Sequence, residues 1–253
     1  MDLQALKELN DKRRAVRRLL SPDNTADALA SYYALWHDPR RTQLTLHHGE
    51  GGQVDGFLVV AQTGADLFRP LVTLRAPDEA AVVEMLHSVL GPSRPYQVIV
   101  PVTLAAAVRT AMSITRSRLT YVYRLDPAQF EPVINVLVRR IESPEDPSGT
   151  SGARRFEIES QGQVMAMSGT NWRSPNFAEV FVYVHPRARG RGWGKSVVSA
   201  CTTALLEDGL RPLYMAEEGN PASQHIAEAL GYVDTGLRDF VAEANLTAQP
   251  RQP

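Results

Sequence analysis

Apolar residues in the first half of the chain switch between helical and extended spacing. Leucines and a valine recur on one side of residues 3–20, which predicts an amphipathic helix, and residues 25–36 predict a second helix with Asn24 or Thr25 as its N-cap. Short runs rich in β-branched residues predict strands with helices between them. The strands are expected at 43–48, 54–62, 67–75, 96–101 and 118–125, and the helices at 79–90 and 104–112.

The second half begins with segments of weak pattern and continues with a regular alternation. Residues 155–160 and 163–172 predict a hairpin that turns at Gln161 and Gly162, and an unbroken β-branched and aromatic run predicts a strand at 177–185. Residues 134–141 fit either a strand or a helix. The remaining expectations are a linker at 127–132, a loop at 142–152, a helix from Lys195 to Gly209, a strand at 212–216, a helix from Asn220 to Leu230, a strand at 233–242 and a frayed tail at 247–253.

Composition narrows the class of protein. The chain has 253 residues, of which 43% are hydrophobic and 22% charged, and its formal net charge is −1. These values fit a globular protein and give no general attraction to nucleic acid or to an anionic membrane. Cys201 is the single cysteine, so an internal disulfide is excluded. The N-terminal residues lack a signal peptide, no apolar run could span a bilayer, and no metal-ligand spacing occurs, so we expect a cytoplasmic protein without a metal.

A glycine-rich turn at Arg189-Gly190-Arg191-Gly192-Trp193-Gly194 joins a predicted strand to a predicted helix. Pro186 ends the strand because it cannot donate a hydrogen bond to a sheet. A turn of this kind presents free backbone N–H groups and the positive end of the helix dipole, which is typical of a phosphate site. The turn therefore predicts an anion site.

Three phosphate motifs compete for this turn. A Walker A loop shares Gly194-Lys195-Ser196 but requires a glycine where Arg189 stands, and the dinucleotide fingerprint requires a wider glycine spacing than this turn has. The third motif, Arg/Gln-x-x-Gly-x-Gly/Ala, is matched at every fixed position. In this the chain resembles the GNAT superfamily of acyl-CoA N-acyltransferases.

A second segment resembles the same superfamily at the appropriate distance downstream. Pro212-Leu213-Tyr214-Met215-Ala216 reads as a short strand, Asn220-Pro221-Ala222-Ser223 opens a helix, and Leu230-Gly231-Tyr232 ends it. The strand and the Asn-x-x-Ser variant look most like the glycine-N-acyltransferase-like branch. The resemblance implies an α/β fold with a mixed sheet of α+β type, in which residues 127–253 form a GNAT acyl-CoA-binding catalytic domain.

The first half has the element order of a GNAT unit but lacks its phosphate loop. The equivalent turn, Ala76-Pro77-Asp78-Glu79, contains no glycine, and its acids would repel a phosphate. We therefore interpret residues 1–126 as a degenerate GNAT-like domain that does not bind coenzyme A. The alternative is an α/β extension whose order is similar by coincidence.

The resemblance also implies how acetyl-CoA is held as a co-substrate. Backbone amides of the turn would bind its pyrophosphate, and the strand before the turn would offer unpaired backbone groups to the thioester. The plain alternatives are a tight turn and an ordinary paired strand. The residues expected to bind acetyl-CoA are Val182, Tyr183, Val184, Arg189, Gly190, Arg191, Gly192, Trp193, Gly194, Lys195, Ser196, Asn220 and Ser223.

Catalysis requires a base for the amine and an acid for the departing thiolate. Glu179 is the expected base: alternation along the strand places it with Phe177, Phe181 and Tyr183, where desolvation would raise its pKa. The alternative is an exposed carboxylate near the start of a strand. In many GNAT enzymes a tyrosine seven positions after the asparagine supplies the acid, but that position is Ala227 here. Tyr183, Tyr214 or His225 is then the substitute, or water serves.

Two functions remain open at this point. The first is an acyl-CoA-dependent N-acetyltransferase that uses direct attack by an amine, and the second is a non-catalytic CoA-binding or regulatory module. A nucleoside triphosphatase is a distant third. The acceptor amine is not specified by the sequence, no nucleic-acid or membrane partner is expected, and a homodimer is allowed.

Overall fold

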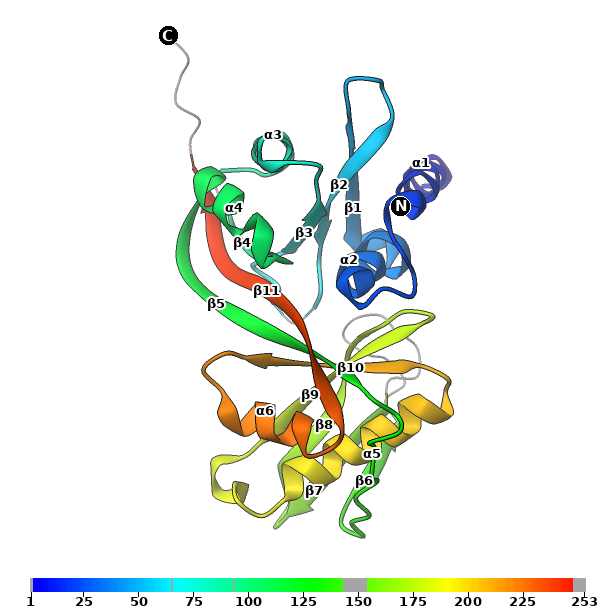
Figure 1. The fold of residues 1–253 in the computed structure, drawn as a ribbon, viewed down its shortest axis with the longest axis vertical. Coiled ribbons are helices and arrows are strands. Elements are labelled where there is room, and N and C mark those ends of the chain that lie inside the picture. Colours follow the sequence, from blue (N-terminus) through cyan, green and yellow to red (C-terminus); the bar gives the residue numbers. More distant parts are fainter. Residues whose placement is uncertain (1, 65, 93, 143–153, 248–253) are drawn as a thin grey trace. The chain divides into compact units, whose positions relative to one another are not determined.

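A computed structural model describes residues 2–64, 66–92, 94–142 and 154–247 (Figure 1). The chain divides into two compact units, of which unit 1 comprises Met1–Leu119 with Arg238–Pro253 and unit 2 comprises Thr120–Leu237. The sequence placed a division between residues 126 and 127, and the assignment of a separate role to each half stays a prediction. Most of the loop expected at 142–152 and most of the tail expected at 247–253 lie outside the described residues.

Unit 1 begins with helical segments. Helix α1 (Leu3–Val16) continues into a 3₁₀ turn, as expected, and the helical segment predicted at 25–36 is confirmed with Asn24 as its N-cap. This segment is not one regular α-helix, because it consists of a 3₁₀ turn (Thr25–Asp27), a short α2 (Ala28–Ser31) and a π-turn (Tyr32–Trp36). The guanidinium of Arg13 donates hydrogen bonds to the carbonyl oxygens of Ala34 and His37. A side chain of α1 therefore stabilises the π-turn at Tyr32–Trp36.

The sheet of unit 1 has both antiparallel and parallel neighbours. Strands β1 (Thr42–His48), β2 (Val54–Ala61) and β3 (Leu71–Arg75) are antiparallel, β3 and β4 (Pro95–Pro101) are parallel, and β11 (Tyr232–Leu246) pairs antiparallel with β4. Helices α3 (Glu79–Val89) and α4 (Ala105–Ala111) bury their apolar sides with this sheet in one core. The predicted strand at 67–75 begins only at Leu71, because Asp66 caps a turn through Arg69.

The sheet of unit 2 has one parallel pair, β9 (Phe177–Val184) with β10 (Arg211–Glu217). Strands β6 (Arg139–Glu142), β7 (Arg154–Ser160), β8 (Gln163–Arg173) and β9 are antiparallel in sequence order, and β5 (Met112–Leu125) pairs antiparallel with β10. Gln161 and Gly162 have φ of 53° and 74°, which confirms the predicted hairpin turn. Within the ambiguous segment 134–141, the strand starts only at Arg139.

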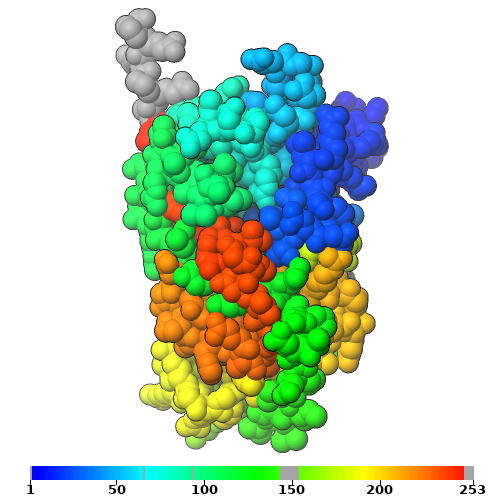
Figure 2. All heavy atoms as spheres, viewed as in Figure 1, coloured from blue at the N-terminus to red at the C-terminus, as the bar shows by residue number. Residues whose placement is uncertain are grey.

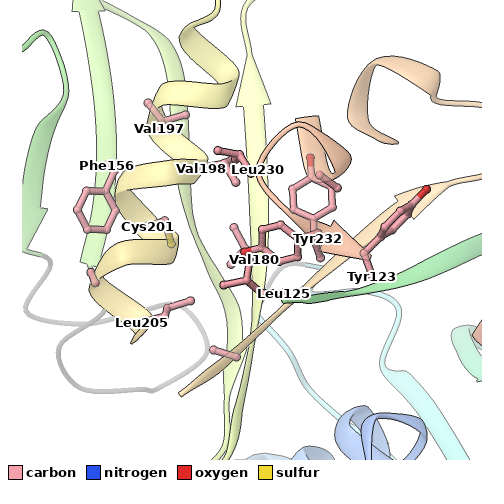
Figure 3. Packing of buried hydrophobic residues seen from close by; sticks show 14 of the residues in the cluster. Tyr123, Leu125, Phe156, Val180, Val197, Val198, Cys201, Leu205, Leu230 and Tyr232 are labelled. Carbon is pink, nitrogen blue, oxygen red and sulfur yellow. The ribbon is translucent and has the colours of Figure 1, made fainter. Parts of the chain in front are cut away.

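Helix α5 (Trp193–Glu207) covers one face of this sheet, and α6 (Pro221–Glu228) lies on the same face. Figure 3 shows α5, with Val197, Val198, Cys201 and Leu205, beside β9, with Val180, and these five residues belong to one buried core. Cys201 is buried in this core, and burial raises the pKa of its thiol to about 12. The alternation predicted for β9 is confirmed on the face opposite Glu179, because Ala178, Val180, Val182 and Val184 pack in one core with α5.

The two units repeat one element order and exchange their last strands. In unit 1 the order β3–α3–β4–α4 matches β9–α5–β10–α6 of unit 2. The strand that follows α4 is β5, whose residues 120–124 pair with β10 of unit 2, and the strand that follows α6 is β11, whose residues 239–245 pair with β4 of unit 1. The predicted strands at 118–125 and 233–242 were therefore too short, because each strand belongs to both units.

Candidate functional site

Strands β9 and β10 of unit 2 pair for only part of their length. Their parallel register runs from Phe177 with Arg211 to Val180 with Tyr214, and no described residue of β10 beyond Tyr214 pairs with β9. From there β10 continues along β5, while β9 continues along β8. A gap in the backbone pairing thus opens between two neighbouring parallel strands.

Backbone groups of β9 face this gap. The N–H of His185 donates to Met165 of β8, and hydrogen-bonding direction alternates along an antiparallel strand. The N–H and C=O groups of Val182 and Val184 therefore point to the side of β10, whereas those of Tyr183 point to β8. Two of the three strand residues expected to offer backbone groups are thus placed to do so.

The glycine-rich turn lies at the end of this strand and leads into α5. Gly190 and Gly192 have φ of 75° and 74°, a region that L side chains rarely adopt, and Gly192 is the N-cap of the helix. A Cβ on Gly194 would lie 2.9 Å from Val184 Cγ2 and 3.0 Å from Ile226 Cδ1. The three glycines therefore have two different roles: the first two shape the turn, and the third allows close packing of α5.

Positive charge surrounds the turn. Arg187, Arg189 and Arg191 are exposed, Lys195 is half-buried, and none of these four forms an ion pair with a described carboxylate. The Arg191 guanidinium lies 5.2 Å from the centre of the Trp193 ring. The cations and the uncapped first turn of α5 make this end of the helix suited to a phosphorylated ligand.

Ser196 faces inward and not toward the turn's outer surface. Its hydroxyl is buried, donates to the carbonyl oxygen of Gly192 at 3.1 Å and accepts from the side-chain amide of Asn135 at 3.1 Å. Ser196 therefore stabilises the start of α5 and the segment that crosses it. Asn135 is not among the predicted site residues, because nothing in the local sequence connects it with a helix that begins at Trp193.

The motif Asn220-Pro221-Ala222-Ser223 forms the start of α6. The side chain of Asn220 accepts a hydrogen bond from the Ser223 N–H at 3.1 Å and so caps the helix. The Ser223 hydroxyl lies 2.9 Å from the hydroxyl of Tyr214, the last residue of β10 that pairs with β9. Asn220 and Ser223 thus lie next to the point at which the strands diverge, and both take part in contacts within the protein.

The carboxylate of Glu179 lies on the face of β9 opposite α5. A β-bulge in β8 places Asn171 as an extra residue between the pairs Thr170–Val180 and Trp172–Glu179, and the side-chain amide of Asn171 donates to the Glu179 carboxylate at 2.8 Å. Glu179 is half-buried. Asn171 is also absent from the predicted site residues, because a bulge depends on pairing with the neighbouring strand and has no local sequence pattern.

The tyrosines near the gap differ in accessibility. Tyr183 is 43% exposed on the Glu179 side of β9, whereas Tyr214 is buried, and burial raises the pKa of its hydroxyl against the opposing hydrogen bond from Ser223. Ala227, at the position where a tyrosine was expected, is completely buried. Of these two hydroxyls, Tyr214 is the one that lies beside the second motif.

The turn of unit 1 that precedes α3 carries acidic side chains, whereas the glycine-rich turn of unit 2 is surrounded by basic ones. The carboxylate of Asp78 caps α3 by accepting from the Ala81 N–H at 2.8 Å, and Glu79 is the first residue of the helix. A carboxylate therefore already occupies the position at which a phosphate would bind. This geometry favours the interpretation that unit 1 does not bind coenzyme A.

Comparison with known proteins agrees with this arrangement. Residues 120–232 match the model of the Acetyltransferase (GNAT) family, so this stretch, nearly all of unit 2, is a GNAT acetyltransferase family domain. The family implies acyl transfer from an acyl-CoA, which is a transferase reaction. No protein of curated function matches the sequence.

Solved structures show the same fold over most of the chain. A GCN5-related N-acetyltransferase from Kribbella flavida superposes with a TM-score of 0.63 at 16% identity, over 87% of this chain and 96% of that one. A GCN5-related N-acetyltransferase-like protein from Streptococcus suis 89/1591 gives a TM-score of 0.63 at 13% identity, over 93% and 99%. A tandem GNAT protein from the clavulanic acid biosynthesis pathway gives 0.57 at 14% identity, over 98% and 97%. The chain has the GNAT fold, as predicted.

Two further properties concern the described residues only. No group of three or more histidine, cysteine, aspartate or glutamate side chains among them is arranged to hold a metal ion. Within the same ranges, every helix is too short or too polar to cross a membrane.

Proposed function

We propose that unit 2 is an N-acetyltransferase that transfers an acetyl group from acetyl-CoA to an amine by direct attack. The observation that carries this proposal is the combination of a strand gap and a helix N-terminus at one place. The gap between β9 and β10 opens after Val180, and β9 then leads directly into the glycine-rich turn and α5. One extended, phosphorylated thioester can use both features.

The turn and the strand have separate roles in this proposal. N–H groups around Gly190 to Lys195 bind the pyrophosphate, and Arg189 and Arg191 add charge from the exposed side. The backbone groups of Val182 and Val184 hold the extended part of the donor and donate to its carbonyl oxygen as negative charge develops there. The glycines at 190 and 192 permit this approach because they have no side chain in the way.

Glu179 accepts the proton that the amine loses. An amine with a pKa near 10.4 is mostly protonated at neutral pH, so a carboxylate next to the acceptor assists attack. Asn171 holds the Glu179 carboxylate through its side-chain amide and fixes its orientation. As the amine nitrogen bonds to the carbonyl carbon, the carbon–sulfur bond breaks and the sulfur takes a proton.

Tyr214 is the protein group best placed to give that proton. It is the last residue of β10 that pairs with β9, its hydroxyl is hydrogen-bonded to Ser223, and burial raises the pKa of that hydroxyl further above neutral pH, so it carries a proton to give. Tyr183 is more exposed and lies on the opposite face of β9. We therefore rank Tyr214 above Tyr183 as the acid, although both remain in the proposal.

A single observation favours the alternative, a CoA-binding module without catalysis. The buried Ala227 stands where many relatives are expected to carry the acidic tyrosine, and its surroundings leave no exposed side chain there. Both functions use the same binding site, so they differ only in turnover.

One experiment separates the two functions. The full chain is titrated with CoA by calorimetry and is then incubated with acetyl-CoA and a panel of amines, amino acids and polyamines, with release of free thiol as the readout. Binding with amine-dependent thiol release supports the transferase, and binding without release supports the module. Absence of CoA binding would contradict both.

A further inference from the structure

The segment that precedes β6 displays apolar side chains to solvent. Ile134 is 92% exposed, Val136 is 94% exposed and Leu137 is 51% exposed, although their neighbours Val133 and Val138 pack against the core of unit 2. Figure 2 shows this segment in green at the surface, in the lower part of the view. Exposed apolar residues scattered singly are normal, whereas these three lie within four consecutive positions. We call Ile134, Val136 and Leu137 the apolar tip.

Hydrogen bonds connect the segment that carries the apolar tip with α5. The N–H of Val133 donates to the Ser199 hydroxyl at 2.7 Å, and the Asn135 amide donates to the Ser196 hydroxyl at 3.1 Å. The Asn135 side chain also accepts from the Leu137 N–H at 3.0 Å, which closes a tight turn. The segment that carries the exposed residues is therefore attached to α5 at Val133 and Asn135.

These hydrogen bonds also give the direction of the segment. Val133 bonds to Ser199 and Asn135 to Ser196, so the segment runs along α5 toward its N-terminus. Ser196 in turn donates to the carbonyl oxygen of Gly192, which is in the glycine-rich turn. Two consecutive hydrogen bonds connect Asn135 with Gly192, and the segment that carries the apolar tip therefore lies beside the first turn of α5, the helix whose N-terminus is the proposed phosphate site.

We propose that the apolar tip binds the adenine base of the acyl donor. The proposal rests on the proposed function, because it requires a nucleotide whose phosphates are bound at the glycine-rich turn. A purine has two apolar faces and no charge, so it gains by covering exposed aliphatic side chains, and the neighbouring cations Arg189, Arg191 and Lys195 suit the phosphates that flank its ribose. The apolar tip thus supplies affinity for the nucleotide end of the donor and takes no part in the chemistry at the thioester.

The test compares donors with and without the nucleotide. The double variant Val136→Ser/Leu137→Ser is titrated with CoA, with adenosine 3′,5′-bisphosphate and with 4′-phosphopantetheine, which lacks the adenosine. We expect CoA and the bisphosphate to bind about threefold to tenfold more weakly, and phosphopantetheine to bind as it does to the parent. The variant Val136→Tyr should bind CoA and the bisphosphate more tightly, because a ring stacks on the base.

A control variant in unit 1 and three possible results decide whether the inference holds. Leu67→Ser/Phe68→Ser removes two exposed apolar residues from unit 1 and should leave all three affinities unchanged. Equal CoA affinity in parent and Val136→Ser/Leu137→Ser would overturn the inference. An equal loss for phosphopantetheine would also overturn it, since the change would then act through α5. A parent protein that binds none of the three ligands would instead refute the proposed function itself.

Discussion

Replacing Gly192 with aspartate or with asparagine isolates the electrostatic part of the proposed phosphate site. The two side chains have nearly the same size, and both tolerate the left-handed backbone better than other residues do. Gly192 has φ of 74°, and a Cβ placed there would meet no atom within 4 Å. Both variants therefore bear the same backbone strain, about 1 to 2 kcal/mol, without a clash. They differ by one negative charge at the N-cap of α5.

The size of the effect follows from the distance between the new carboxylate and the bound phosphates. At a separation of about 4 Å, two unit charges repel by about 1 kcal/mol in bulk water and about 4 kcal/mol at an effective dielectric constant near 20. The turn is exposed, so the effect should lie between these limits. We expect the aspartate variant to bind CoA between about fivefold and a thousandfold more weakly than the asparagine variant.

Calorimetric titration of both variants with CoA, at low and at moderate salt, provides the measurement. The difference between them should decrease as salt increases, because the interaction is exposed and screened. Circular dichroism and thermal unfolding check that both variants are folded. If folded aspartate and asparagine variants bind CoA with the same affinity, the phosphates do not lie at this helix N-terminus and the assignment of the turn is wrong.

Three further predictions concern catalysis, stoichiometry and pH. Glu179→Gln should lower acyl transfer about a hundredfold to ten-thousandfold near neutral pH while CoA affinity is kept, and the deficit should shrink at high pH, where the amine is already deprotonated; a pH–rate profile with full activity in the variant would remove Glu179 as the base. Calorimetry should give one CoA per chain, because the carboxylate of Asp78 occupies the equivalent turn of unit 1, and two equivalent sites would contradict this. Burial raises the pKa of Asp239 to about 6, although the nearby charge of Arg75 lowers it. The folded protein therefore keeps a proton that the unfolded chain loses near pH 4. As a result, the free energy of unfolding falls as pH rises from about 4 to about 6. Asp239→Asn should therefore raise the free energy of unfolding at pH 7 by about 2 to 3 kcal/mol and leave it unchanged below pH 4, as measured by urea unfolding with Glu50→Gln as the exposed control; a constant difference at all pH values would refute the assignment.

Local pattern was sufficient for most of the elements. Strands β1, β2, β4, β7, β8, β9 and β10 and helices α1, α3, α5 and α6 lie within a few residues of their predicted positions, since each has a clear period and a glycine, proline or capping residue at its end. The glycine-rich turn and the motif that begins at Asn220 were also predicted from the sequence. Backbone conformation at Gly190 and Gly192 depends on the residue type itself, which is why these positions could be interpreted without a structure.

Pairing between distant segments decided the rest. The gap that exposes the backbone of Val182 and Val184 depends on where β10 separates from β9. The bulge that brings Asn171 to Glu179 depends on the register between β8 and β9. The exchange of β5 and β11 depends on which strand of which unit each of them pairs with. None of these has a local signature, because a strand has the same alternation whichever neighbour it pairs with. The residues therefore determined what each segment is, and the tertiary structure determined which groups are left free to meet a ligand.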